Sequence, residues 1–149
     1  MTGSEPISQL YSRKILTFAA DIPRLGRLAA PDASGDAVSR LCGSEIHVDI
    51  KVDGEGRITD FAQEIKACAL GQTSASIVAR HVIGATRADI AAARDAMVFM
   101  LKDGAPEPAG RFEDLKVLAP VKDYPARHAS VLLIFDALLK AFGALEGTA

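Results

Sequence analysis

The sequence lacks tryptophan and has only two tyrosines and two cysteines among its 149 residues. It contains no Lys/Arg run, 17 basic residues against 19 acidic ones, and no interleaving of basic and aromatic side chains. Nucleic-acid binding therefore has little support. No Walker loop, GxGxxG, HExxH or GxSxG sequence occurs, so nucleotide-dependent and triad-type hydrolase functions are not supported either.

The N-terminal sequence MTGSEPISQL has neither a basic nor an apolar targeting region, and no apolar run approaches the length of a membrane span. We therefore expect a cytoplasmic protein with no membrane partner. The chain is long enough to bury a core without disulfides or a structural metal, so we expect a single domain over residues 1–149. In a reducing compartment, two cysteines are more often free thiols, metal ligands or reactive groups than a disulfide.

A β-hairpin is the clearest structural pattern in the chain. Apolar and polar side chains alternate over residues 45–52, which is typical of a half-buried strand. Residues 53–56, Asp-Gly-Glu-Gly, tolerate positive φ and allow the chain to reverse into a second strand over residues 57–66. Because the apolar residues of that second strand do not alternate strictly, we predict a bulge near Thr59 or Asp60.

The two cysteines flank this hairpin, Cys42 before its first strand and Cys68 after its second. An antiparallel hairpin brings the start of one strand beside the end of the next, so the two thiols are predicted to lie close together. Cys68 also precedes a helix, whose free N–H groups and dipole would stabilise a thiolate. A buried structural cysteine is the alternative, and the second cysteine favours a nucleophile or a metal ligand.

The remaining chain predicts mostly helices. With the strands early, the helices late and no βαβ alternation, the sequence predicts an α+β fold, a small antiparallel sheet packed on one face by helices. The predicted segments are a helix from Ser4 to Pro23, a loop over 22–40, helices over 72–83 and 86–104 (the second with a Thr86/Asp89 capping box), a short helical piece over 112–118 stopped by Pro120, and a central apolar helix over 127–142.

Three polar residues could join the cysteines at one rim. Ser44 follows Cys42 on the turn that enters the first strand, and His128 and Ser130 lie near the start of the last helix. Histidine is a common metal ligand, whereas hydroxyls are poor ligands for soft metals. A closed zinc or iron-sulfur site prefers several thiolates, and the chain has two. We assign no role to His47 or His81.

Several stretches share their spacing with one known family. Residues 22–26 (IPRLG) are similar to an NPRNxG loop, 42–44 (CGS) to CGD, 58–68 to a strand that ends in GC, 73–76 (TSAS) to an SAS run, and 115–127 to a connection that ends in PxR. In these features the chain resembles the iron-sulfur cluster assembly scaffold family of IscU, SufU and the NifU N-terminal domain. It is most similar to the SUF-type branch.

The resemblance implies an α+β scaffold domain that receives sulfur from a PLP-dependent cysteine desulfurase and passes its product to cluster-transfer proteins. It also implies a [2Fe-2S] cluster, iron or zinc held by three cysteines and an aspartate. Cys42 and Cys68 match the first two cysteines, but Ser44 stands at the aspartate and Ser130 at the third cysteine. His128 lies close to the position of the third cysteine, and a small shift would bring it into the site.

Two hypotheses follow from this ligand set. In the first, the protein is a cluster scaffold or sulfur acceptor rather than an enzyme; Cys42 and Cys68 act as ligands or persulfide carriers, and His128, Ser130 or Ser44 completes the metal coordination. In the alternative, it is a degenerate homologue that binds no metal and binds or regulates the desulfurase or another assembly factor. A thiol-redox protein is a third class, which has little support because CxxC is absent.

Overall fold

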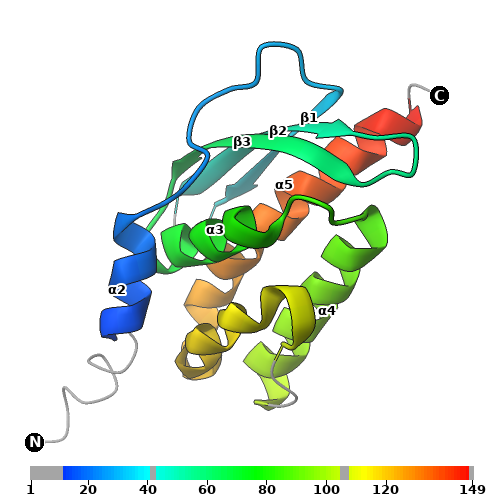
Figure 1. The fold of residues 1–149 in the computed structure, drawn as a ribbon. Coiled ribbons are helices and arrows are strands. Elements are labelled where there is room, and N and C mark those ends of the chain that lie inside the picture. The colour runs from blue at the N-terminus through cyan, green and yellow to red at the C-terminus, as the bar shows by residue number, and fades with distance from the viewer. Residues whose placement is uncertain (1–11, 41–42, 105–107, 148–149) are drawn as a thin grey trace, which may run out of the picture.

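The computed structural model describes residues 12–40, 43–104 and 108–147. They form one sheet and a set of helices that lie on a single face of it, so the α+β prediction is confirmed (Figure 1). In chain order the elements are α2 (Arg13–Ala20), β1 (Ala33–Ser39), β2 (Ser44–Val52), β3 (Ile58–Lys66), α3 (Ala69–His81), α4 (Arg87–Asp103), the 3₁₀ segments η2 (Gly110–Asp123) and η3 (Pro125–Arg127), and α5 (His128–Gly147).

The predicted hairpin is present as β2 and β3 in a sheet of order β1-β2-β3, with antiparallel neighbours. The register pairs Lys51 with Asp60 and Val52 with Ile58, which leaves Thr59 as an extra residue. The predicted bulge is thus confirmed. At the reversal the carboxylate of Asp53 accepts hydrogen bonds from the backbone N–H groups of residues 55 and 57, and Gly56 has a φ of 78°.

Strand β1 lies inside the segment that was predicted to be a loop, and that prediction is wrong. Its sequence, ASGDAVS, has small polar residues and no apolar alternation. Packing explains why it is nevertheless a strand. A side chain at Gly35 would overlap the backbone carbonyl of Ala137 in α5 and would lie 2.7 Å from the backbone nitrogen of Ala141. Only small residues let α5 lie directly against this strand.

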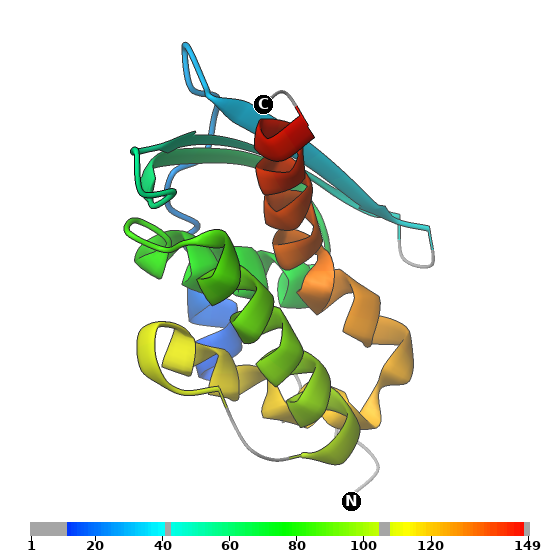
Figure 2. The ribbon, with the colours of Figure 1, turned by 90° about the vertical axis from the view of Figure 1, so that its right-hand side faces the viewer.

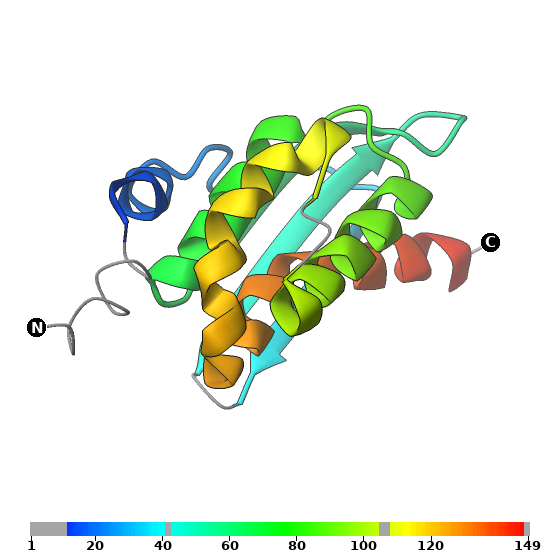
Figure 3. The same cartoon turned by 90° about the horizontal axis from the view of Figure 1, so that it is seen from below.

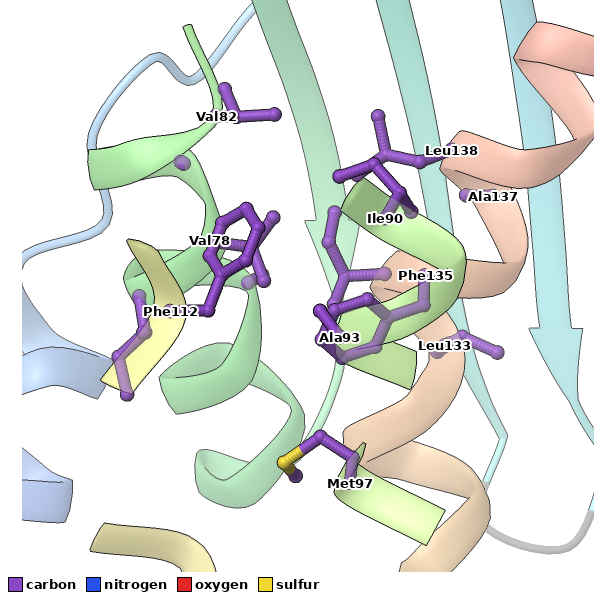
Figure 4. Packing of buried hydrophobic residues seen from close by; sticks show 14 of the residues in the cluster. Val78, Val82, Ile90, Ala93, Met97, Phe112, Leu133, Phe135, Ala137 and Leu138 are labelled. Carbon is purple, nitrogen blue, oxygen red and sulfur yellow. The ribbon is translucent and has the colours of Figure 1, made fainter. Parts of the chain in front are cut away.

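The core lies between the sheet and the helices (Figures 2 and 3). Strand β2 contributes alternating buried residues, and α5 runs beneath β1 and β2 through the middle of the molecule. Figure 4 shows side chains of α3, α4, η2 and α5 meeting in this core. Buried residues on these four elements include Val78, Ile90, Met97, Phe112, Phe135 and Leu138, and Val82 directly after α3 is buried with them.

Several element boundaries differ from the predictions. Ser12 is extended and caps α2 by accepting a hydrogen bond from the backbone N–H of Ile15, so the predicted helix from Ser4 does not run through this point. Residues 1–11 lie outside the described part. Helix α3 begins at Ala69 and not at Gln72. Its N-cap residue is Cys68, whose backbone is extended. The capping box of α4 and the end of this helix at Gly104 are confirmed, and Gly104 adopts a left-handed φ of 83°.

The segment before the last helix is longer than predicted. Pro120 does not stop it, because the chain is wound as 3₁₀ helix from Gly110 to Asp123. Helix α5 then extends to Gly147. The stretch Pro125–Leu145 is long and apolar enough to cross a membrane by length and composition, so the expectation that no apolar run approaches that length is wrong. Half of its most apolar window is buried, which fits the core helix of this fold.

The contact between β1 and α5 predicts an asymmetric response to two glycine substitutions. Gly35→Ala should lower the free energy of unfolding by about 1–3 kcal/mol, because the new methyl group overlaps the α5 backbone. Gly54→Ala is the control, since no atom lies within 4 Å of the added Cβ and its φ is not positive. Urea denaturation measures both variants. Equal stability of the two would contradict the described packing.

Candidate functional site

Three side chains from separate elements meet at one end of the sheet. The Sγ atom of Cys68, just before α3, lies 3.3 Å from the Oγ atom of Ser130 in the first turn of α5. The Ser130 Oγ lies 3.5 Å from the Oγ atom of Ser44, the first residue of β2. Both serines are buried, with exposed fractions of 1% and 2%, and Cys68 is half-buried. The structure therefore brings together three of the five predicted site residues.

Local structure explains this convergence. Strand β2 begins beside the end of β3, where Glu45 pairs with Lys66, so Ser44 reaches the residues that lead into α3. Helices α3 and α5 approach closely at Gly71, which has no side chain. A Cβ added there would lie only 2.6 Å from the Ser130 Oγ. The Ser74 hydroxyl fixes the same approach by donating to the backbone carbonyl of Val131 at 2.6 Å.

Of the other two predicted residues, the structure places His128 away from this group. Cys42 lies outside the described residues. The Nε2 atom of His128 lies 2.9 Å from the backbone oxygen of Val121 and 3.3 Å from that of Lys122, and because carbonyls only accept, this nitrogen donates to the end of η2. Residues two apart on a helix do not face each other, so His128 and Ser130 point to different surroundings.

The described donors do not make up a cluster or zinc site. They consist of one thiol and two hydroxyls, and the two hydroxyls hydrogen-bond to one another. Over the described ranges, no group of three or more His, Cys, Asp or Glu residues could hold a metal ion. Soft metals prefer thiolates, and hydroxyls bind them poorly.

A second polar cluster, centred on Asp49, was missed by the sequence prediction. The Asp49 carboxylate is fully buried and accepts hydrogen bonds from Arg27 Nε at 2.8 Å, the Leu28 backbone N–H at 3.0 Å, Ser34 Oγ at 2.6 Å and His47 Nε2 at 2.8 Å. Burial alone would raise the pKa of Asp49, but these hydrogen bonds outweigh it and hold the pKa well below its usual range. Asp49 occupies a polar position of the β2 alternation, so the pattern indicated a solvent-facing side chain.

This cluster fixes the loop that resembles NPRNxG against the sheet. The loop also pairs with β3, since Gln63 donates to the Arg24 carbonyl at 2.9 Å and accepts from the Gly26 N–H at 2.8 Å. Arg24 has a left-handed φ of 61°, which is uncommon for a non-glycine residue. Leu25, between these two bonds, is 60% exposed. The loop is thus a constrained segment that presents an apolar side chain.

His47 links two carboxylates. Its Nδ1 lies 2.8 Å from Asp36 Oδ1 and its Nε2 lies 2.8 Å from Asp49 Oδ1. Ionised carboxylates only accept hydrogen bonds, so both contacts are satisfied only when both ring nitrogens carry protons. Burial opposes the charged ring, but the hydrogen bonds to the two carboxylates outweigh burial and raise the pKa of His47 above its usual value.

The fold and the site together define a class of protein. It is an α+β domain whose sheet is covered on one face, with a half-buried thiol at the start of a helix and a constrained loop along β3. The model of the NifU-like N terminal domain family matches residues 10–131. The chain belongs to this family, and the resemblance noted in the sequence is confirmed.

Individual relatives agree with this assignment. The crystal structure of a nitrogen-fixing NifU-like protein (N-terminal) from Brucella abortus is 51% identical, has a TM-score of 0.92 and covers 97% of this chain and 99% of its own. The iron-sulfur cluster assembly scaffold protein IscU of Thermotoga maritima is 26% identical over 132 residues, which are 89% of this chain and 92% of that protein. A putative SUF-system scaffold (SufU) from Fervidobacterium islandicum, at 22% identity, TM-score 0.80 and coverage of 90% and 97%, shows the same fold.

The two hydrogen bonds between the His47 ring and carboxylates predict a pH dependence of stability. Because the folded pKa lies above the unfolded value of 6.5, the stabilisation is complete below that pH and is lost as pH rises through the folded pKa. The stability advantage of the wild type over His47→Gln should therefore shrink above about pH 6.5. Denaturation over a pH series measures this difference, with His81→Gln as control. An advantage that grows with pH would contradict this description of the ring.

Proposed function

We propose that this protein is a sulfur acceptor in iron-sulfur cluster assembly, that Cys68 receives sulfur from a PLP-dependent cysteine desulfurase, and that the protein does not hold a lasting cluster on its own. It acts as a carrier and not as an enzyme. Membership of a family that includes cluster scaffolds supports the pathway. Cys42, the second thiol of the chain, is a second candidate acceptor.

The observation that carries this proposal is the hydrogen-bonded group Cys68–Ser130–Ser44. Ser44 and Ser130 match the positions of an aspartate and a cysteine ligand in the family resemblance, so two anionic donors are replaced by neutral hydroxyls. Each buried hydroxyl is satisfied by hydrogen bonding within the protein. Two neutral hydroxyls in place of anionic donors suit sulfur acceptance better than the retention of a metal.

The transfer is a thiol–persulfide exchange. The Cys68 thiolate attacks the terminal sulfur of the desulfurase persulfide, a new S–S bond forms on Cys68, the S–S bond on the enzyme breaks, and the desulfurase cysteine leaves as a thiolate. The exchange involves no net oxidation or reduction. In its thiolate form Cys68 accepts a hydrogen bond from the Ser130 hydroxyl, and as the N-cap residue of α3 it lies at the positive end of the helix dipole.

A second candidate function is supported by a different observation. If the buried hydroxyls mark a site that has lost its chemistry, the fold serves to bind and regulate the desulfurase without accepting sulfur. The constrained loop with its exposed Leu25 is the feature that favours partner binding. The two functions differ in whether sulfur reaches Cys68.

Sulfur transfer is tested with the cysteine desulfurase of the same organism, L-cysteine and no iron. Mass spectrometry of the alkylated protein should show one added sulfur atom on Cys68 in the wild type and in Cys42→Ala, and no sulfur at position 68 in Cys68→Ala. Ser130→Ala should slow loading by removing the hydroxyl donor, since a hydrogen bond to a charged group contributes about 1.5–3 kcal/mol.

The control is the desulfurase alone, which must carry its own persulfide under the same conditions. If it does and Cys68 remains unmodified, sulfur acceptance at Cys68 is wrong. A change in desulfurase turnover that persists in the Cys42→Ala/Cys68→Ala protein would then favour the regulatory function.

A further inference from the structure

We infer that two copies of this chain pair through the outer edge of β1, as antiparallel strands centred on Val38. Strand β1 is one of the two edge strands of the sheet, and within the described ranges it pairs only with β2. The opposite edge of the sheet is different, because Leu25 forms a bridge with Gln63 of β3 there. In the part of the chain that the structure describes, the β3 edge thus carries a loop bridge, and no strand or bridge covers the β1 edge.

The open edge lacks the features that usually prevent strand pairing. Exposed edge strands typically carry a lysine, a proline or a bulge. Strand β1, ASGDAVS, has no lysine or proline, and its register with β2 is regular over all of its residues, from Ala33 opposite Ile50 to Ser39 opposite Ser44. Val38 on this strand is 62% exposed. The edge is therefore regular, contains no lysine and is partly apolar.

The exposed residues along this edge are self-complementary. Asp36 and Val38 of β1 and Arg40, the turn residue directly after the strand, alternate along the chain and are all exposed, so one acidic and one basic side chain flank an apolar one. When two copies pair antiparallel about Val38, each Val38 faces the other Val38, and each Asp36 faces Arg40 of the second copy. A two-fold interface of this kind uses the same patch on both copies. Opposite charges directly across two strands stabilise their pairing.

A groove beside the edge extends the same pattern. It lies between β1 and α5 and is lined by Ala37, Val38, Leu133, Asp136, Leu139 and Lys140, again with apolar side chains and one charge of each sign. Asp136 already pairs with Arg94 of α4 at 2.7 Å, so the groove is held by the fold and not by the second copy. Because two edge strands and one groove bury little surface, we expect a weak, reversible dimer.

The pairing would place the two candidate sites near one another. Ser39 lies opposite Ser44, so the end of β1 close to Val38 is also the end of the sheet that holds the Cys68–Ser130–Ser44 group. Across the two-fold axis the two Ser44 residues are separated by three strand spacings, or about 15 Å. A dimer thus sets two thiol sites side by side. This inference does not depend on the proposed sulfur transfer.

Sedimentation velocity over a range of protein concentrations tests the pairing. The wild type should show a concentration-dependent dimer. Arg40→Asp gives an edge with two acids, and Asp36→Arg gives an edge with two bases, so each variant alone should remain monomeric. An equimolar mixture of the two should dimerise again, because every acid then faces a base across the interface.

Recovery in the mixture also shows that both variants are folded, which matters because Asp36→Arg removes a hydrogen bond of His47. Arg13→Asp, the same charge change at an exposed position on α2, is the control and should dimerise as the wild type does. A wild type that stays monomeric at every concentration would overturn the inference. A dimer that persists in both single variants, or no recovery in the mixture, would overturn it as well.

Discussion

The packing of α5 against β1 determines both the fold and the position of the candidate site. Gly35 lets the α5 backbone touch the strand, and this contact sets where the helix lies under the sheet. The first turn of α5 then meets the start of α3, where Gly71 leaves room for Ser130. Since Ser130 reaches Cys68 only through this arrangement, two glycines and one apolar helix place the thiol in its surroundings.

The surroundings of that thiol decide which part of the family's chemistry it supports. A thiolate or carboxylate at positions 44 and 130 would bring negative charge to a metal, whereas two hydroxyls bring none at neutral pH. In this protein the hydroxyls of Ser44 and Ser130 form a short hydrogen-bonded chain that ends at Cys68. Such a chain can stabilise a sulfur anion but supplies few donors for iron, which is why we favour sulfur transfer over cluster storage.

Local sequence patterns were sufficient for the hairpin, its bulge at Thr59 and the capping box of α4, because short-range sterics and hydrogen bonds determine them. The family resemblance could also be recognised from the sequence, because it depends on the spacing of short motifs. Strand β1 was not predictable, because its small residues have no periodicity and acquire their structure from α5. The buried carboxylate of Asp49 was missed for a similar reason, because three of its hydrogen-bond partners, Arg27, Leu28 and Ser34, are distant in the sequence. The prediction that His128 joins the site was based on its closeness to Ser130 in the sequence. Helix geometry turns the two side chains in different directions.

The central claim is that hydroxyls at positions 44 and 130 leave the site able to accept sulfur but not to retain a cluster. Anaerobic reconstitution with iron and sulfide, followed by desalting and visible absorption, tests it most directly when the wild type is compared with Ser44→Asp/Ser130→Cys. The account predicts no retained charge-transfer absorbance in the wild type and its appearance in the double variant, where the donor set of the family is restored. A wild type that retains the absorbance, with its loss in Cys68→Ala, would contradict the account.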